Sequence, residues 1–182
     1  MRQKIKERGF TLVEVLVSAF IIAILSTIML INYRQSNRQY ALLRSANKLA
    51  QDIRRAQQMA MGAQECPQKC EGGNPCPCAG QIPLGYGIYL NAGGTNYLLY
   101  ADRDGSENYS GGDTDIETIP LESGVSIQST NPASLSVNFR PPDPTTTING
   151  NSTINEGIIT LAPQSGLSKT IKVNKAGLIE TQ

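Results

Sequence analysis

Histidine and tryptophan are both absent from the 182 residues. Without histidine there is no Ser-His-Asp or Cys-His catalysis and no histidine-ligated metal site, so the sequence gives little support to an enzyme. Strong charge of one sign is also absent, because sixteen Lys and Arg residues stand against fifteen Asp and Glu residues. A protein that binds nucleic acid through its charge carries a larger basic excess. These absences favour a structural or binding role over catalysis.

A basic leader and an apolar stretch open the chain. Residues 1–9 hold four basic side chains and one acidic one, which predicts a cytoplasmic N-terminus and an extracytoplasmic C-terminus. Residues 10–31 contain one charged side chain, Glu14, and are long enough to cross roughly 30 Å of hydrocarbon as a helix. Gly9 stands before the apolar run, whereas an ordinary secretory signal is cut after it. We therefore expect residues 10–31 to stay with the product as a membrane anchor.

Glu14 is costly in this setting, because an ionisable group inside an apolar span costs a few kcal/mol on insertion scales. Two interpretations are open from the residues alone. In a plain signal anchor, the side chain of Glu14 would reach out to the lipid headgroups. Alternatively, Glu14 has a functional partner inside the membrane or in an assembly.

The order of these features resembles the class III signal of type IV pilins and pseudopilins: a basic leader, then Gly-Phe-Thr-Leu-Val-Glu at residues 9–14, then an apolar helix. The resemblance implies that a prepilin peptidase cuts between Gly9 and Phe10 and methylates the new N-terminus at Phe10. The product would carry twelve basic and fourteen acidic side chains. The resemblance also implies that Glu14 meets the N-terminal amine of a neighbouring subunit in a filament. Each charge would offset the cost of burying the other, and the pair would set the axial register.

The same resemblance implies where the protein works and what it contacts. Its partners would be other pilin or pseudopilin subunits, the prepilin peptidase, the inner-membrane assembly platform and, before assembly, the lipid bilayer. The protein would be a single-pass protein of the bacterial inner membrane, with a cytoplasmic N-terminus and an extracytoplasmic globular domain. It would then pass into a pilus or pseudopilus.

Helical periodicity continues beyond the apolar stretch. Apolar residues recur at intervals of three and four from Leu42 to Ala60, and charged residues occupy the other side. Neither Gly nor Pro occurs between Phe10 and Met61, which predicts one helix of about 50 residues. We expect a transmembrane half at residues 10–31 and an amphipathic half at residues 32–62.

Four cysteines follow in a Pro- and Gly-rich loop at residues 63–84, namely Cys66, Cys70, Cys76 and Cys78. Their spacing matches a structural zinc site poorly. An extracytoplasmic location favours oxidation, so we expect two local disulfides, with zinc ligation and free thiols as the alternatives. A bond between Cys76 and Cys78 would close a strained ring, so Cys66 and Cys70 should each bond to one of them; the residues do not decide which.

From residue 85 the apolar pattern changes to a period of two. A hairpin around residues 91–95 and further short strands are predicted, with no helix-length pattern between them, so the sheet should be antiparallel. The further strands are expected at residues 116–121, 124–128, 135–139, 157–161, 169–173 and 177–181. Residues 140–155 are rich in Pro, Thr and Asn and are predicted to form an exposed loop.

The fold class is therefore predicted to be α+β, with a long N-terminal helix packed on a C-terminal antiparallel β-sheet domain at residues 85–182. The resemblance makes this arrangement pilin-like. A Tyr-Gly-Ile-Tyr strand at residues 86–89 and an Asp-x-Asp-Gly turn at residues 102–105 also resemble the GspH/FimT-type minor pseudopilins.

One acidic cluster follows the first hairpin, formed by Asp102, Asp104, Asp113 and Asp115. Oxygen-rich loops of this kind bind Ca²⁺, but the spacing fails the EF-hand pattern, which needs an acid at its first position and Glu at its twelfth. The cluster is either a structural calcium site or a solvated turn. No other cofactor is expected.

The leading functional hypothesis is a minor pilin or pseudopilin, a structural subunit of a type IV pilus, a type II secretion filament or a DNA-uptake filament. One alternative is a DNA-binding minor pilin in natural transformation. Only Lys169, Lys172 and Lys175 would serve it, and a few phosphate contacts give weak, salt-sensitive binding, so nucleic acid is not expected as a partner. The other alternative is a membrane-anchored extracytoplasmic enzyme or sensor domain.

Overall fold

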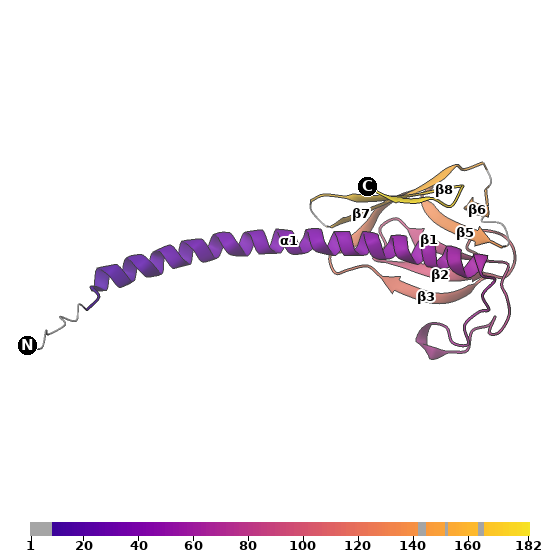
Figure 1. The fold of residues 1–182 in the computed structure, drawn as a ribbon, viewed down its shortest axis with the longest axis horizontal. Coiled ribbons are helices and arrows are strands. Elements are labelled where there is room, and N and C mark those ends of the chain that lie inside the picture. The colour runs from indigo at the N-terminus through magenta and orange to yellow at the C-terminus, as the bar shows by residue number, and fades with distance from the viewer. Residues whose placement is uncertain (1–8, 142–144, 152, 164–165) are drawn as a thin grey trace, which may run out of the picture. The chain divides into compact units, whose positions relative to one another are not determined.

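The computed structural model describes residues 9–141, 145–151, 153–163 and 166–182, without the side chains of residues 28–32, 34 and 71. Of the predicted leader only Gly9 is among them. The chain divides into two compact units, residues 1–37 and residues 38–182. In the described part, the elements are one long helix, one short 3-10 helix and nine strands (Figure 1).

The long helix α1 runs from Leu12 to Met61 and has 50 residues. It ends where Gly62 follows, whose backbone N–H donates to the carbonyl of Gln58 at 2.9 Å. Nowhere in the part of the chain that the structure describes does a helix meet the combined length and hydropathy of a membrane span. The span expected at residues 10–31 includes side chains outside that part, those of residues 28–31, and it stays a prediction.

The strands form two antiparallel sheets, so the α+β class and the antiparallel pairing are confirmed, although the sequence suggested a single sheet. One sheet has the order β3-β2-β1-β5-β6 and the other the order β4-β7-β8-β9. The bounds are β1 (Gly85–Asn91), β2 (Asn96–Asp102), β3 (Thr114–Pro120), β4 (Val125–Asn131), β5 (Ser134–Arg140), β6 (Thr145–Ile148), β7 (Glu156–Pro163), β8 (Lys169–Asn174) and β9 (Ile179–Thr181).

The loop between β1 and β2 ties the two sheets together. The backbone N–H of Gly93 donates to the carbonyl of Ile127 in β4 at 2.7 Å, and the N–H of Ile127 donates to the carbonyl of Gly94 at 2.8 Å. These two bonds occupy peptide groups at the outer edge of β4, which is the first strand of its sheet.

Strand β6 corrects the prediction of an exposed loop over residues 140–155. Thr145–Ile148 pairs with β5, and Ile148 is fully buried opposite Val137. The prolines and threonines before it suggested a loop, but β-branched Thr and Ile also suit a strand, and the neighbouring strand decides between the two. Residues 142–144 and 152 of the predicted loop lie outside the described part.

The second half of α1 shares one hydrophobic core with the inner faces of both sheets. Its small and aliphatic side chains, among them Ala46, Leu49 and Ile53, are wholly buried in the same cluster as Ile88 and Ile159. Polar contacts add to this packing. Tyr97 in β2 donates its hydroxyl hydrogen to Asp52, Arg55 pairs with Glu117 in β3 at 2.9 Å, and Gln57 donates to the carbonyl of Gly177 at 3.4 Å.

The outer face of the five-stranded sheet is polar, yet its centre is buried. Tyr100, Ser136 and Asn138 are at most 1 % exposed, and the register places Gly87 opposite both Tyr100 and Asn138. A Cβ at Gly87 would lie 2.5 Å from the Tyr100 ring, so glycine makes room for this ring. The loop between β2 and β3, residues 103–113, covers the face, for example where the N–H of Tyr109 donates to Ser136 Oγ at 3.2 Å.

Candidate functional site

The predicted cleavage junction, Gly9–Phe10, lies just before α1 begins. Phe10 is 80 % exposed, and a Cβ added at Gly9 would meet no atom within 4 Å. The fold of the described residues therefore gives no steric reason for glycine at position 9.

Thr11 is the N-cap of α1. Its Oγ1 accepts the backbone N–H of Glu14 at 3.3 Å, and its carbonyl accepts the N–H groups of Glu14 and Val15 at 3.1 and 3.2 Å. Thr11 and Glu14 thus stand at the two positions of a capping box. Sequence reasoning did not assign Thr11 a role, although the Thr-x-x-Glu spacing before an apolar run is a recognisable helix start.

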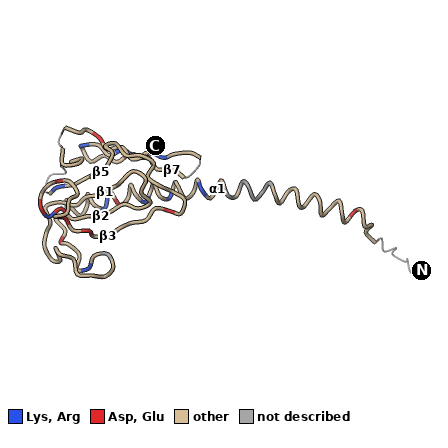
Figure 2. The backbone as a smooth tube through the Cα atoms, turned by 180° about the vertical axis from the view of Figure 1, so that it is seen from behind, with Lys and Arg blue, Asp and Glu red and all other residues tan. Residues whose placement is uncertain are grey.

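Glu14 stands alone as a charge among apolar side chains. Ten large aliphatic and aromatic side chains from Leu12 to Leu25 are between 46 and 78 % exposed, and at 3.6 residues per turn they cover every side of the helix. Glu14 is the only charged residue of residues 10–27, and Figure 2 shows acidic colouring near the N-terminal end of α1. Among the side chains that the structure describes, none forms a hydrogen bond or ion pair with the Glu14 carboxylate.

The hydroxyl groups of the same segment are satisfied within the helix. Ser18 Oγ donates to the carbonyl of Glu14 at 2.8 Å, Ser26 Oγ to that of Ile22 at 2.7 Å, and Thr27 Oγ1 to that of Ala23 at 2.9 Å. Such bonds let Ser and Thr sit in an apolar environment at low cost. Glu14 is therefore the one charged residue of residues 10–27, and none of the described side chains pairs with it.

The four cysteines form two nested disulfides, Cys66–Cys78 and Cys70–Cys76. This is one of the two pairings that the sequence left open, and it replaces the zinc and free-thiol alternatives. The inner pair closes a tip that contains the 3-10 helix η1 (Glu71–Gly73). Cys66, Cys76 and Cys78 are buried in the main core, so the loop is held against the globular unit.

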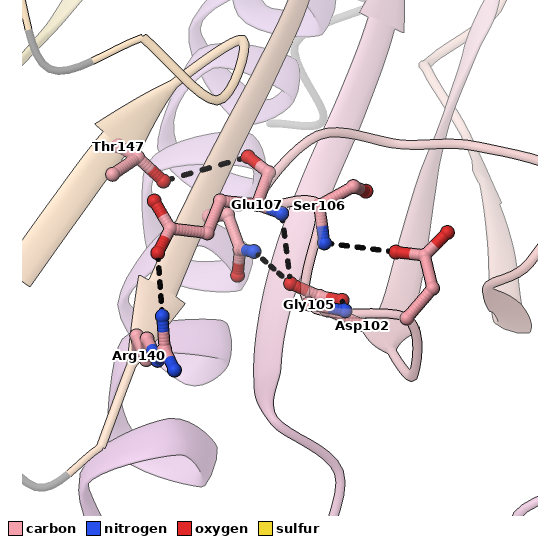
Figure 3. A network of polar contacts seen from close by, with 8 residues as sticks. Asp102, Gly105, Ser106, Glu107, Arg140 and Thr147 are labelled. Atoms are coloured by element: carbon pink, nitrogen blue, oxygen red, sulfur yellow. Dashed lines mark hydrogen bonds and ion pairs between the residues drawn. The ribbon is translucent and has the colours of Figure 1, made fainter.

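Asp102 is a buried carboxylate at the end of β2, and this corrects its interpretation as part of a solvated turn. It is 1 % exposed, and its Oδ1 accepts the N–H of Gly105 at 2.7 Å. Its Oδ2 accepts the N–H of Glu107 at 3.1 Å and the side-chain amide of Asn138 at 2.7 Å. Figure 3 shows the loop turning around this carboxylate, so Asp102 fixes the loop that covers the sheet.

Asp104 and Asp113 lie beside Asp102, with carboxylate oxygens of all three within 4.8 Å of one another. Asp104 accepts the hydroxyl of Ser110 at 2.7 Å and the N–H of Ser106 at 2.9 Å, and these bonds lower its pKa. Asp113 accepts the N–H of Ser110 at 2.7 Å, but partial burial raises its pKa. The three carboxylates thus already hold the loop through hydrogen bonds, and the calcium interpretation stays a prediction.

Asp115, the fourth residue of the predicted cluster, belongs to a different set of contacts. It is exposed on β3, and its Oδ1 accepts the hydroxyl hydrogen of Tyr109 at 3.0 Å. The fold therefore brings together three of the four predicted carboxylates and places the fourth beside a tyrosine. Sequence spacing could not show this, because it depends on where Tyr109 lies on the sheet.

Comparison with known proteins bears on the N-terminal segment. Residues 4–30 match the family described as the prokaryotic N-terminal methylation motif. No curated protein and no solved structure matches the chain. The match includes Gly9, Phe10 and Glu14, and it agrees with the class III signal predicted from the residues. The chain therefore carries the N-terminal signal of type IV pilin-like proteins.

Proposed function

We propose that the protein is a minor pilin or pseudopilin, a structural subunit of a type IV pilus, a type II secretion filament or a DNA-uptake filament, and not an enzyme. The observation that carries this proposal is the methylation motif at residues 4–30, with its Gly9–Phe10 junction directly before the capped start of α1. A prepilin peptidase cuts after Gly9 and methylates the amine of Phe10. The order of helix and antiparallel strands supports a place near the GspH/FimT-type minor pseudopilins.

The apolar part of α1 supports membrane residence before assembly. A helix with apolar side chains on every side is stable where lipid or other helices surround it. We propose that residues 10–31 sit in the inner membrane, with the globular unit outside the cytoplasm, until the assembly platform moves the subunit into a filament. The disulfides at Cys66–Cys78 and Cys70–Cys76 agree with an oxidising compartment.

Glu14 has a specific role in this proposal. In a filament, the Glu14 carboxylate forms an ion pair with the methylated N-terminal amine of Phe10 from a neighbouring subunit and accepts a hydrogen bond from it. Each charge alone would be costly among apolar helices, and together they offset much of that cost. Because the pair forms at one axial offset only, it fixes the register between adjacent subunits.

Mass spectrometry of the N-terminal peptide tests the proposal directly. The protein is expressed with and without an active prepilin peptidase, extracted from membranes and digested. We expect a peptide that begins with N-methyl-Phe10 only when the peptidase is active, and an intact Met1 or formyl-Met1 terminus without it. A Gly9→Val variant serves as the uncleaved control, and the fold accommodates it because a Cβ at position 9 would meet no atom of the described residues within 4 Å. An intact leader in the presence of the peptidase would refute the proposal.

A further inference from the structure

A hollow of about 230 Å³ lies on the outer face of the five-stranded sheet, beside the loop of residues 103–113. Its base crosses three strands, because Tyr89 in β1 stands opposite Leu98 in β2, and Leu98 stands opposite Thr118 in β3. Tyr109 and Asp115 also line it. The hollow therefore combines an aliphatic side chain, two aromatic rings and one carboxylate.

The two tyrosine rings are held in fixed positions. The rings of Tyr89 and Tyr109 stack with centroids 4.5 Å apart and planes tilted by 30°. The Tyr109 ring also meets the Tyr100 ring in an edge arrangement at 5.3 Å. Tyr100 is wholly buried, and its hydroxyl bonds to Ser136 Oγ at 2.7 Å. A ligand would thus meet a pre-formed aromatic surface and would not have to order it.

The hydroxyl hydrogens of these two tyrosines already have acceptors, although Asn91, Asn96 and Thr118 also line the hollow and carry donors of their own. The hydroxyl of Tyr89 donates to Asn91 Oδ1 at 2.9 Å, and the hydroxyl of Tyr109 donates to Asp115 Oδ1 at 3.0 Å. Burial and then the bond to Asp115 raise the pKa of Tyr109 to about 12, so this hydroxyl keeps its proton. Both hydroxyl hydrogens are therefore in use, and the phenol oxygens and the second oxygen of Asp115 remain as acceptors.

Negative charge around the hollow is uncompensated. A second hollow of about 350 Å³ shares Tyr109 and Asp115 with the first and adds Asp113. Neither hollow is lined by Lys or Arg among the residues described. Glu107 and Glu117 have Arg partners, but within the described chain no ion pair involves Asp113 or Asp115. A ligand that brings positive charge and hydrogen-bond donors would match this environment.

We propose that the hollow at Tyr89, Tyr109 and Asp115 binds the guanidinium group of an arginine side chain from a partner polypeptide. Guanidinium is planar, always charged and carries five donors and no acceptor, so it suits stacked aromatic rings beside a carboxylate. The methylene stem of the arginine would lie along Leu98. This proposal concerns the globular unit alone and does not depend on the N-terminal signal.

NMR titration of the full chain in a non-ionic detergent tests this site. The probe is the peptide acetyl-Gly-Arg-Gly-amide at low ionic strength, and the matched control is the same peptide with citrulline, which is neutral and nearly isosteric. The protein carries ¹³C-labelled tyrosine, and Tyr→Phe variants assign the rings. We expect the arginine peptide to shift the Tyr89 and Tyr109 signals saturably and the citrulline peptide to leave them in place.

Variants then locate the binding. Asp115→Asn and Tyr89→Leu should each weaken binding by about two- to five-fold, as expected for an exposed ion pair and an exposed cation–π contact. Glu180→Gln removes an exposed acidic charge elsewhere and should bind like wild type. Tyr89→Phe keeps the ring and loses only the phenol oxygen, so it should weaken binding less than Tyr89→Leu. Spectra of each free variant report whether it is folded.

Three results would overturn the proposal. Equal shifts with the citrulline peptide would show that charge is not recognised. Unchanged affinity in folded Asp115→Asn and Tyr89→Leu would place the binding elsewhere on the chain. Saturable shifts of the same rings with neutral methyl glucoside but not with the arginine peptide would identify a sugar site instead.

Discussion

Replacing Asp102 by asparagine should destabilise the globular unit much more than the same change at the neighbouring Asp104. Both carboxylates accept hydrogen bonds from the loop after β2, but only Asp102 is buried. Its two oxygens accept three donors, from Gly105, Glu107 and Asn138. The carboxylate thereby fixes the loop that covers the outer face of the five-stranded sheet (Figure 3).

The magnitude follows from counting what an asparagine can accept. Its one oxygen can face the two donors on the Oδ2 side, and its NH₂ group then opposes the N–H of Gly105. Leaving this partly buried donor without a partner costs about 1–3 kcal/mol, and the two remaining bonds lose their charge-assisted part. Removing the buried charge also removes its desolvation cost, which offsets part of this loss. We therefore expect the free energy of unfolding to fall by about 2–4 kcal/mol in total. For a unit of this size that corresponds to a drop in Tm of roughly 4–16 °C.

The assay is thermal and urea unfolding of the full chain in a non-ionic detergent, followed by the near-UV circular dichroism of tyrosine. Tyrosine reports well here, since the chain has seven Tyr and no Trp. Asp104→Asn removes the same charge from an exposed position in the same loop and should stay close to wild type. Equal losses in the two variants, or an Asp102→Asn protein as stable as wild type, would refute the role assigned to Asp102.

Three further outcomes are expected. Gly87→Ala should lower the free energy of unfolding by about 1–3 kcal/mol, since its Cβ would lie 2.5 Å from the Tyr100 ring. Gly111→Ala is the control, because its Cβ would meet no described atom within 4 Å, and it should leave the free energy of unfolding from urea titration nearly unchanged. Equal losses in Gly87→Ala and Gly111→Ala would contradict the close contact at Gly87. Because burial raises the pKa of Asp113, its stabilising contribution is present below the ordinary aspartate pKa and is lost as pH rises through the raised value. When the pH is raised from about 4 to about 7, wild type loses this contribution to the free energy of unfolding and Asp113→Asn does not. Identical pH dependence of urea unfolding in the two proteins would argue against the raised pKa. Glu14→Val should leave cleavage after Gly9 intact but reduce the amount of protein recovered in sheared filaments, because removing one partner of a buried ion pair costs about 3–5 kcal/mol. Equal recovery of variant and wild type would contradict the registry role of Glu14.

The sequence alone determined the features that depend on neighbours along the chain. The signal at residues 9–14 is a run of adjacent residues, and the family match over residues 4–30 agrees with it. The 50-residue helix follows from apolar spacing and the absence of Gly and Pro, which are properties of one segment. The strand positions followed in the same way from period-two patterns between turn residues. Among the strands of the described residues, β6 alone was missed, because Thr145–Ile148 becomes a strand through pairing with β5.

Tertiary structure decided what depends on residues far apart in the sequence. The cysteine spacing allowed two pairings, and the folding of the loop against the core selected Cys66–Cys78 and Cys70–Cys76. The spacing of the four aspartates gave no sign that Asp102 is buried, because its burial comes from a loop folded over the sheet. Nor did it show Asp115 beside Tyr109, since that contact requires a tyrosine from the loop to lie across β1 and β2. Local patterns fix helices, strands and signals, whereas the environment of a side chain is set by whichever distant segments pack around it.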